Sequence, residues 1–173
     1  LSPKHLQPSI VAKWLELAQA PVVLTLRRRA NGGKFDGSEM EQVRILESLP
    51  RAIVDLEVET IEGFLGGSLS SLRSALHTWI ASYHNFQDTP ADLSTIFRRL
   101  KKCGSEIVKI ATEARSFADN FRLLEQAEVA RQEGIPIILA AMGEAGTFSR
   151  IMATGRGSLW TYASLQKGRE SAA

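Results

Sequence analysis

The sequence contains very little cysteine and few aromatic residues, and charge of neither sign dominates it. Only one of its 173 residues is a cysteine, so Cys103 has no partner within the chain for a disulfide. Lysine and arginine number 21 and aspartate and glutamate 19, a net charge of +2. The acids are spread among the bases, and the aromatic residues, 7% of the chain, are not interleaved with them. This composition argues against a nucleic-acid-binding surface.

Long hydrophobic runs and an export signal are also missing. No apolar run approaches the roughly 18 residues that a membrane-spanning helix requires. The chain does not begin with a charged and then apolar segment that leads to a small-residue cleavage site. Together with the single cysteine, these absences predict a cytoplasmic protein that neither spans nor binds a membrane. The composition, 44% hydrophobic and 23% charged, is typical of a soluble globular domain.

What the sequence does contain is a regular alternation of strand-like and helix-like segments. Short runs rich in β-branched and apolar residues begin every 22 to 31 residues, which is close to the length of one βα unit. This alternation predicts a parallel sheet covered by helices. Six strands are expected, at Val22–Leu26, Ile53–Glu57, Trp79–Tyr83, Ile107–Ile110, Ile137–Ala141 and Leu159–Tyr162.

The segments between these runs carry helix signals. A serine and a glutamate-rich first turn open Ser38–Leu49, and Thr-Pro opens Thr89–Leu100. The segment Ala118–Gln132 is followed by Gly134-Ile135-Pro136, a sequence that ends helices. A further helix, Pro8–Gln19, comes before the first strand. The chain is therefore predicted to be an α/β domain that opens on a helix.

Alternating βα units can close into a barrel, but this chain is short for one. A complete barrel has eight units and normally takes roughly 200 to 250 residues, whereas six units are visible here. The reactive groups of such barrels lie where the strands end. At these ends the sequence places Arg27, Glu57, His84, Lys109, Met142-Gly143-Glu144 and Tyr162.

Lys109 and His84 are the candidate catalytic residues. Lys109 stands among apolar residues of an expected buried strand, and burial favours the neutral, nucleophilic form of an amine. It could also reach past the end of the strand into water. His84 is suited to proton transfer near neutral pH, or it could be a polar residue satisfied within the structure. The other histidines, His5 and His77, have no metal-ligand spacing, so no metal site is predicted.

Two arginines could bind a carboxylate, because guanidinium groups are planar and permanently charged. Arg150 follows the glycine-rich turn at 142–146, and Arg27 opens a run of three arginines. That run could also be a solvated turn, and Arg150 could form a structural ion pair with Glu57 or Glu144.

Two glycine-containing turns are weaker candidates. Gly32-Gly33-Lys34-Phe35 lacks the spacing and the serine or threonine of a phosphate-binding loop. Gly155-Arg156-Gly157-Ser158 could hold a phosphate, although its glycines are also typical of a tight turn.

Five segments together resemble the type I 3-dehydroquinate dehydratase family, the Schiff-base class of the shikimate pathway. They are Leu24-Thr25-Leu26-Arg27 with Gly32-Gly33, Val54-Asp55-Leu56-Glu57, Ser82-Tyr83-His84-Asn85-Phe86 with Thr89-Pro90, Ile107-Val108-Lys109-Ile110-Ala111, and Met142-Gly143-Glu144-Ala145-Gly146 through Ser149-Arg150-Ile151. The resemblance implies a (β/α)8 TIM-type barrel that lacks its first two strands in this chain. It also implies a single dehydratase domain over residues 1–173, incomplete at both ends.

The resemblance further implies a lyase reaction, the syn elimination of water from 3-dehydroquinate to give 3-dehydroshikimate. Lys109 would form a Schiff base with the C3 ketone, and His84 would act as the proton shuttle. The protein's own amine would serve as electron sink, so neither a metal nor an organic cofactor is implied. The residues that match the family's substrate contacts are Arg27, Arg150, Met142 and, in the closing lid, Ser171.

Three features depart from the family's pattern. Asn31 stands where many members carry an acidic residue that assists the histidine, and an asparagine cannot hold the charge of a protonated imidazole. The family's first two strands have no counterpart before Leu1. The glutamine of the lid, expected just beyond Ser171, would fall after Ala173.

Two other functions stay open at this point. One is another Schiff-base barrel enzyme of the class I aldolase type, although the paired arginines favour a carboxylate substrate over a sugar phosphate. The other is a catalytically weak domain that serves as a binding or assembly module. As partners, the resemblance implies the small-molecule substrate, a homodimer and, in some organisms, fusion to shikimate dehydrogenase.

Overall fold

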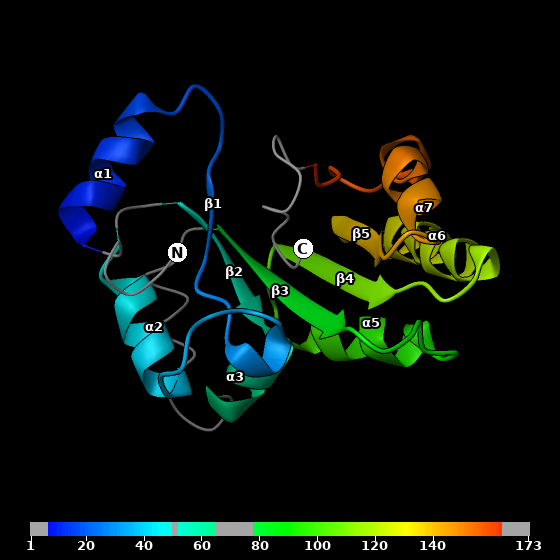
Figure 1. The fold of residues 1–173 in the computed structure, drawn as a ribbon, viewed down its shortest axis with the longest axis horizontal. Helices are drawn as coiled ribbons and strands as arrows, with labels where there is room; N and C mark the ends of the chain where they lie inside the picture. The colour runs from blue at the N-terminus through cyan, green and yellow to red at the C-terminus, as the bar shows by residue number, and fades with distance from the viewer. Residues whose placement is uncertain (1–6, 50–51, 65–77, 164–173) are drawn as a thin grey trace. The chain divides into compact units, whose positions relative to one another are not determined.

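The computed structural model describes residues 7–49, 52–64 and 78–163 (Figure 1). The chain divides into two compact units, Leu1–Ala81 and Ser82–Ala173. The five strands of the described residues follow one another in the sheet in chain order, from β1 to β5. Helices stand between successive strands, so the predicted α/β class with a parallel sheet is confirmed.

The first unit is built on two short parallel strands. Helix α1 (Pro8–Leu17) leads to β1 (Val23–Thr25), and a 3-10 turn, η2 (Arg29–Asn31), follows it. After α2 (Glu39–Glu47), β2 (Ile53–Glu57) pairs with β1 and places Thr25 opposite Asp55. Strand β2 passes directly into α3 (Val58–Phe64). The core of the unit combines the aromatic side chains of Phe35 and Trp79 with aliphatic side chains from strands and helices, among them Val11, Leu24, Leu26, Val43, Leu46, Val54, Leu56 and Ile61.

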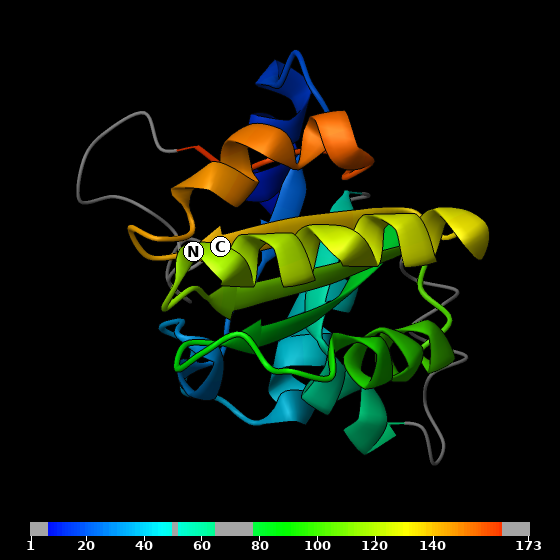
Figure 2. The same cartoon turned by 90° about the vertical axis from the view of Figure 1, so that its right-hand side faces the viewer.

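The boundary between the two units lies within β3 (Thr78–Asn85): the strand begins in the first unit, and the second unit starts at Ser82. It continues with α5 (Leu93–Lys102), β4 (Ile107–Glu113), α6 (Phe117–Gln132), β5 (Ile137–Met142), α7 (Thr147–Met152) and the 3-10 turn η3 (Thr154–Arg156). Strands β4 and β5 pair in parallel. The first six residues of β4 are all buried, as expected for a parallel strand covered on both faces. Helices α6 and α7 lie side by side in this unit (Figure 2).

Strand β4 is longer than predicted, and this changes where Lys109 stands. The strand continues three residues past Ile110 because Ala111, Thr112 and Glu113 keep pairing with β5. Lys109 therefore lies in the interior of a strand, and its predicted place at a strand end is wrong.

The sixth predicted strand, Leu159–Tyr162, is wrong. The segment touches β5 through one bridge, Ile137 to Ser158, and through the Leu159 amide, which donates to the Ile137 carbonyl at 2.8 Å. The Ser158 hydroxyl donates to the Trp160 carbonyl at 2.9 Å, so the chain turns on itself after the bridge. Five strands are present in the described ranges, where six were expected.

The four predicted helices are present, with most ends within two residues of the prediction and one start four residues later. Helix α2 begins after the predicted serine, which forms a capping box: the Glu41 amide donates to Ser38 Oγ and the Ser38 amide to the Glu41 carboxylate. Helix α5, by contrast, begins at Leu93 and not at Thr89. Its cap is Asp92, whose carboxylate accepts from the Thr95 amide at 2.9 Å.

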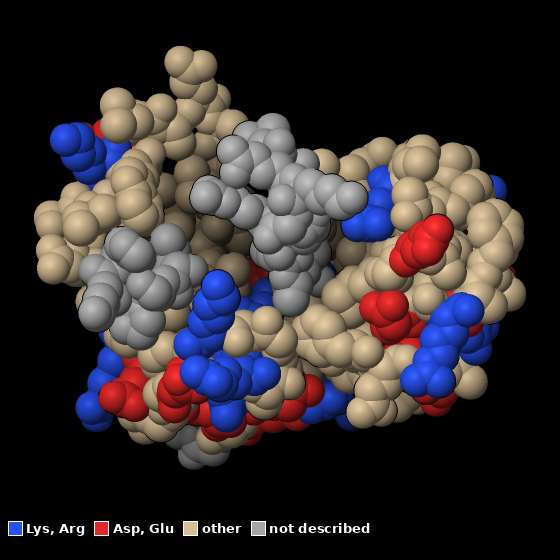
Figure 3. Space-filling model, in the orientation of Figure 1, with Lys and Arg blue, Asp and Glu red and all other residues tan. Residues whose placement is uncertain are grey.

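Charged side chains of both signs are mixed at the surface. On the face drawn in Figure 3, blue and red side chains of the described residues lie beside one another. None of the helices in the described ranges combines the length and the apolar composition that crossing a membrane would take.

Helix α6 is anchored at its start by a buried carboxylate. Asp119 is 5% exposed, and its Oδ2 accepts from the amides of Arg115 and Ser116, both at 2.8 Å. Its other oxygen pairs with the Arg122 guanidinium. Burial by itself raises the pKa of Asp119, but the hydrogen bonds from Ser116, Arg122 and Arg115 outweigh it and lower the pKa.

We expect Asp119→Asn to lower the free energy of unfolding by about 1 kcal/mol at pH 7, the usual loss for a helix cap. A lowered pKa contributes stability above the ordinary value of about 4, and this contribution is lost as the pH falls through the folded value. The difference from wild type should therefore shrink below about pH 4 in urea titrations. Glu125→Gln, an exposed change on the same helix, is the control, and an equal loss in both variants would contradict the role of Asp119.

Candidate active site

Lys109 is the most deeply buried basic side chain of the second unit among the described residues. Its neighbours Val108 and Ile110 are fully buried, and only 1% of its own surface is exposed. Its Nζ lies 4.6 Å from the centroid of the Tyr162 ring. The amine thus stays inside the protein, and the alternative of a side chain that reaches past the strand into water is wrong.

His84 lies near the end of β3, the strand next to β4 in the sheet. It is 9% exposed, and its ring stacks on Phe86 with a centroid distance of 6.1 Å and an interplanar angle of 13°. This stacking restricts rotation of the imidazole. The two predicted catalytic residues therefore come from adjacent strands, and both are buried.

Two buried threonines tie the chain that leaves β3 to the end of β4. Thr89 Oγ1 donates to the Glu113 carbonyl at 3.0 Å and lies 2.9 Å from Thr112 Oγ1. Since the Thr89 hydroxyl has one proton, Thr112 is the donor in the second bond. The sequence predicts a helix start at Thr89 and gives no sign of these bonds, because the partners are more than 20 residues away in the chain.

The turn after β5 is held by one serine and one asparagine. Ser149 Oγ donates to the Gly146 carbonyl at 2.9 Å and accepts from the Ala141 amide at 3.0 Å. Asn120, fully buried on α6, accepts from the Ser149 amide at 2.9 Å and donates to the Ala145 carbonyl at 2.8 Å. A Cβ at Gly146 would stand 2.3 Å from the Met142 carbonyl oxygen, so only glycine fits there.

Arg150 is partly exposed on α7 and donates to Thr147 Oγ1 at 3.2 Å. Within the described part of the chain it forms no ion pair, and the alternative of a structural pair with Glu57 or Glu144 is not observed there. Met142 is the last residue of β5 and is partly buried. Ser171, predicted to belong to a lid, lies outside the described residues.

In the first unit, Arg27 is held by two buried carboxylates. Asp55 and Glu57 are two residues apart on β2 and so share a face of the strand. Arg27 Nη2 lies 2.9 Å from Asp55 Oδ2, and Nη1 lies 3.4 Å from Glu57 Oε1. The exposed fractions are 9%, 2% and 0% for Arg27, Asp55 and Glu57. A solvated turn at Arg27 is therefore wrong, and its guanidinium is part of a buried ionic cluster.

Gln42 orients Glu57 within this cluster. Its Nε2 donates to Glu57 Oε2 at 2.7 Å and to the Leu26 carbonyl at 2.9 Å, and its Oε1 accepts from Thr60 Oγ1 at 2.9 Å. Gln42, Glu57 and Thr60 are fully buried. Sequence reasoning missed Gln42, although an amide one turn before the buried Leu46, on an apolar helix face, was the available signal.

Asn31 contributes a side-chain amide at the position where many family members carry an acidic residue. Its Nδ2 donates to Glu59 Oε2 at 3.3 Å, so the asparagine is itself bound to a carboxylate. The turn that carries it also requires Gly33, where a Cβ would stand 2.0 Å from the Arg27 carbonyl oxygen.

The chemistry of these residues is that of an amine, an imidazole and guanidinium groups. A buried amine can add to a carbonyl, an imidazole can carry a proton, and guanidinium groups bind carboxylates and hydroxyls. In the described ranges, no three His, Cys, Asp or Glu side chains are grouped as they would be around a metal ion.

The sequence matches a family model described as Type I 3-dehydroquinase over residues 4–173. It is 37% identical over 167 residues to a 3-dehydroquinate dehydratase of Dehalococcoides mccartyi, which covers 92% of this chain and 73% of that protein. It is 32% identical over 157 residues to a bifunctional 3-dehydroquinate dehydratase/shikimate dehydrogenase of Arabidopsis thaliana, covering 88% of this chain and 25% of that one.

The fold is also that of solved members. The crystal structure of 3-dehydroquinate dehydratase from Geobacillus kaustophilus superposes with a TM-score of 0.79 at 26% sequence identity. The match covers 93% of this chain and 66% of the other, so the chain spans about two thirds of that enzyme. On sequence and fold together, the chain belongs to the type I 3-dehydroquinase family of lyases.

Proposed function

We propose that this chain eliminates water from 3-dehydroquinate, giving 3-dehydroshikimate, through a Schiff base on Lys109. The observation that carries the proposal is the burial of that lysine, which is 1% exposed in the interior of β4. A lysine amine kept away from bulk water can add its lone pair to a ketone, and the surrounding protein excludes solvent from the intermediate. The face of Tyr162, 4.6 Å from Nζ, would in turn stabilise the cation that a protonated imine carries.

The reaction balances without a cofactor. Lys109 Nζ joins the ketone carbon and the ketone oxygen leaves as water, so that a protonated imine forms. The imine draws electrons from the neighbouring carbon, which loses a proton, and the hydroxyl one carbon further leaves as water in the syn sense. Hydrolysis of the imine then releases the product and restores the amine.

His84 is the proton shuttle of this proposal. Each stage moves a proton at or near the imine, and His84 stands on the strand adjacent to Lys109, with its ring held against Phe86. Imidazole is the group best suited to give and take protons near neutral pH.

The two arginines would bind different parts of the substrate. Arg150 carries no counter-charge among the described residues and suits the carboxylate. Arg27 already faces two carboxylates, so its charge is balanced and it suits the hydroxyl groups. We include Met142 as a packing residue and Ser171 as a lid residue of the same site.

A Schiff base can be trapped by borohydride, which reduces the imine to a stable amine. We expect borohydride and 3-dehydroquinate together to add the mass of the reduced ligand to the peptide that contains Lys109, as measured by mass spectrometry. Borohydride alone and Lys109→Met should give no adduct. A folded wild-type protein that turns over substrate without an adduct would exclude the mechanism, and one with neither adduct nor turnover would support the binding-module alternative.

We expect His84→Asn to lower kcat by a factor of about 10² to 10⁴, the usual contribution of a positioned acid or base. The adduct on Lys109 should still form, only more slowly, because the nucleophile is intact. Phe86→Leu, which removes only the stacked ring, should lower kcat much less. Unchanged kcat in His84→Asn would remove the histidine from the mechanism.

Gln42→Leu should leave a buried Glu57 oxygen and the Leu26 carbonyl without their hydrogen-bond donor. Each unsatisfied group should lower the free energy of unfolding by about 1 to 3 kcal/mol. If Glu57 positions Arg27 for the substrate, KM should also rise while the adduct on Lys109 still forms. Gln132→Leu, an exposed change of the same chemistry, should alter unfolding in urea by less than about 0.5 kcal/mol. Lost stability with unchanged KM would assign Gln42 a purely structural role.

Cytoplasmic location, a homodimer and fusion to shikimate dehydrogenase stay predictions for this chain. Fusion has a precedent in the bifunctional relative from Arabidopsis thaliana, which combines both names in one protein. The class I aldolase alternative has no support from the family match.

A further inference from the structure

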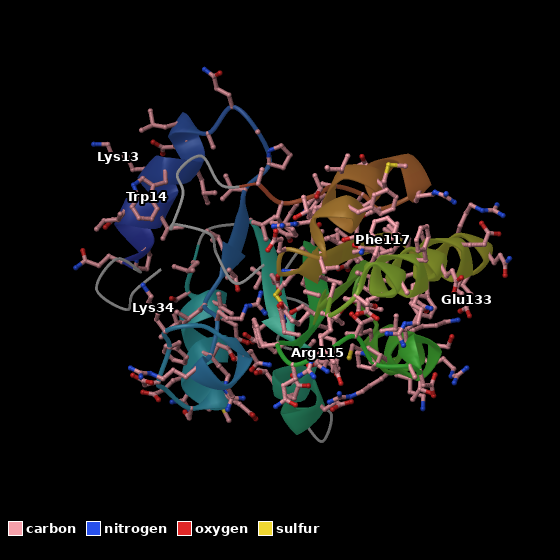
Figure 4. The ribbon with its side chains drawn as sticks, turned by 45° about the vertical axis from the view of Figure 1, so that its right-hand side comes forward. Lys13, Trp14, Lys34, Arg115, Phe117 and Glu133 are labelled. Carbon is pink, nitrogen blue, oxygen red and sulfur yellow. The ribbon has the colours of Figure 1, made fainter. Side chains whose placement is uncertain are left out.

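A groove of about 570 Å³ lies in the second unit between α6 and the segment of α7 and η3. None of its lining residues belongs to the set proposed for catalysis. Its α6 side is formed by Phe121, Leu124, Glu125, Glu128 and Arg131, which recur every three or four residues and so share one helix face. In Figure 4, Phe117 and Glu133 mark the two ends of that helix. The volume is within the usual range of small-molecule sites.

One end of the groove is aromatic. The rings of Phe121 and Phe148, on α6 and α7, have centroids 5.7 Å apart and are tilted by 46°. Phe117 adds a third ring at 5.3 Å from Phe121 and 4.9 Å from Phe148. Phe117 and Phe121 are 56% and 45% exposed. Exposed rings that already cluster offer a surface on which a further ring can stack or pack edge-on.

The remaining lining is charged, and its groups differ in how they are paired. Arg131 donates to both oxygens of Glu128, at 2.8 and 2.6 Å, and together with a bond from Gln132 these bonds lower the pKa of Glu128 to about 2. That pair is therefore neutral as a unit. Glu125 and Arg156 form no ion pair with any other described residue, so one carboxylate and one guanidinium face the groove with their charges uncompensated.

The turn that carries Arg156 leaves the groove open. A Cβ at Gly155 would meet nothing within 4 Å, and Gly157 has a φ of 105°, which glycine adopts without strain. Because glycines flank Arg156, no neighbouring side chain of this turn fills the groove.

We propose that this groove binds a small aromatic zwitterion, of the size of an aromatic α-amino acid. Its ring would lie against Phe121 and Phe148, its carboxylate on Arg156 and its ammonium group on Glu125. A ligand of one sign would leave one of the two uncompensated groups unpaired, whereas a zwitterion satisfies both. The inference does not rest on the proposed reaction, because the groove is lined by other residues.

Four probes separate the contributions to binding. L-phenylalanine carries the ring and both charges, 3-phenylpropionate lacks the ammonium group, phenethylamine lacks the carboxylate, and L-alanine lacks the ring. Titration of the full chain by calorimetry or NMR should show saturable binding of L-phenylalanine, with each other probe at least about fivefold weaker. No saturation by L-phenylalanine, or equal binding of all four, would overturn the proposal.

The protein variants give an independent check. Arg156→Gln and Glu125→Gln, both at exposed positions, should each weaken L-phenylalanine binding by about tenfold, the effect of one charge-assisted hydrogen bond. Arg98→Gln, an exposed arginine on α5, is the matched control and should bind as wild type. Unchanged affinity in Arg156→Gln would contradict the assignment. So would a dimer, seen by sedimentation, that Phe121→Ser dissociates, because a second copy would then occupy the face.

Discussion

The parallel pairing of β4 with β5 is the constraint on which the second unit depends. The pairing continues from Val108 to Glu113, so Lys109 stands opposite Ile138, inside the sheet and away from water. Had pairing ended at Ile110, the amine would have stood at a strand end. The burial of Lys109, on which the proposed imine chemistry depends, thus follows from its place inside a paired strand.

Two buried polar networks hold the residues around these strands. In the first unit, Gln42 connects α2 to Glu57 on β2, and Glu57 faces Arg27. In the second, Asn120 connects α6 to the turn before Ser149, which keeps α7 and Arg150 in place. Both networks use a side-chain amide, which donates and accepts hydrogen bonds at the same time and so can bridge two segments.

Helix α6 serves two faces of the second unit. Its buried side holds Leu123, Ala127 and Ala130 in the core and presents Asn120 to the turn after β5. Its outer stripe, from Phe121 to Arg131, lines the groove. The outer face of a helix that packs on a sheet usually carries charged and polar residues. On α6 this face also carries an exposed aromatic cluster.

The α/β class, five of the strands and the family could be predicted from the amino-acid sequence, because they depend on local periodicity and on short motifs around Lys109 and His84. The interior position of Lys109, the buried ion pairs of Arg27 and the irregular conformation of residues 159–162 depend on packing between segments far apart in the chain. The tertiary structure also revealed Gln42, Thr89 and Asn120 as bridging residues. Their partners are 15 to 29 residues away in the chain, and a hydrogen bond across such a distance leaves no pattern in the sequence.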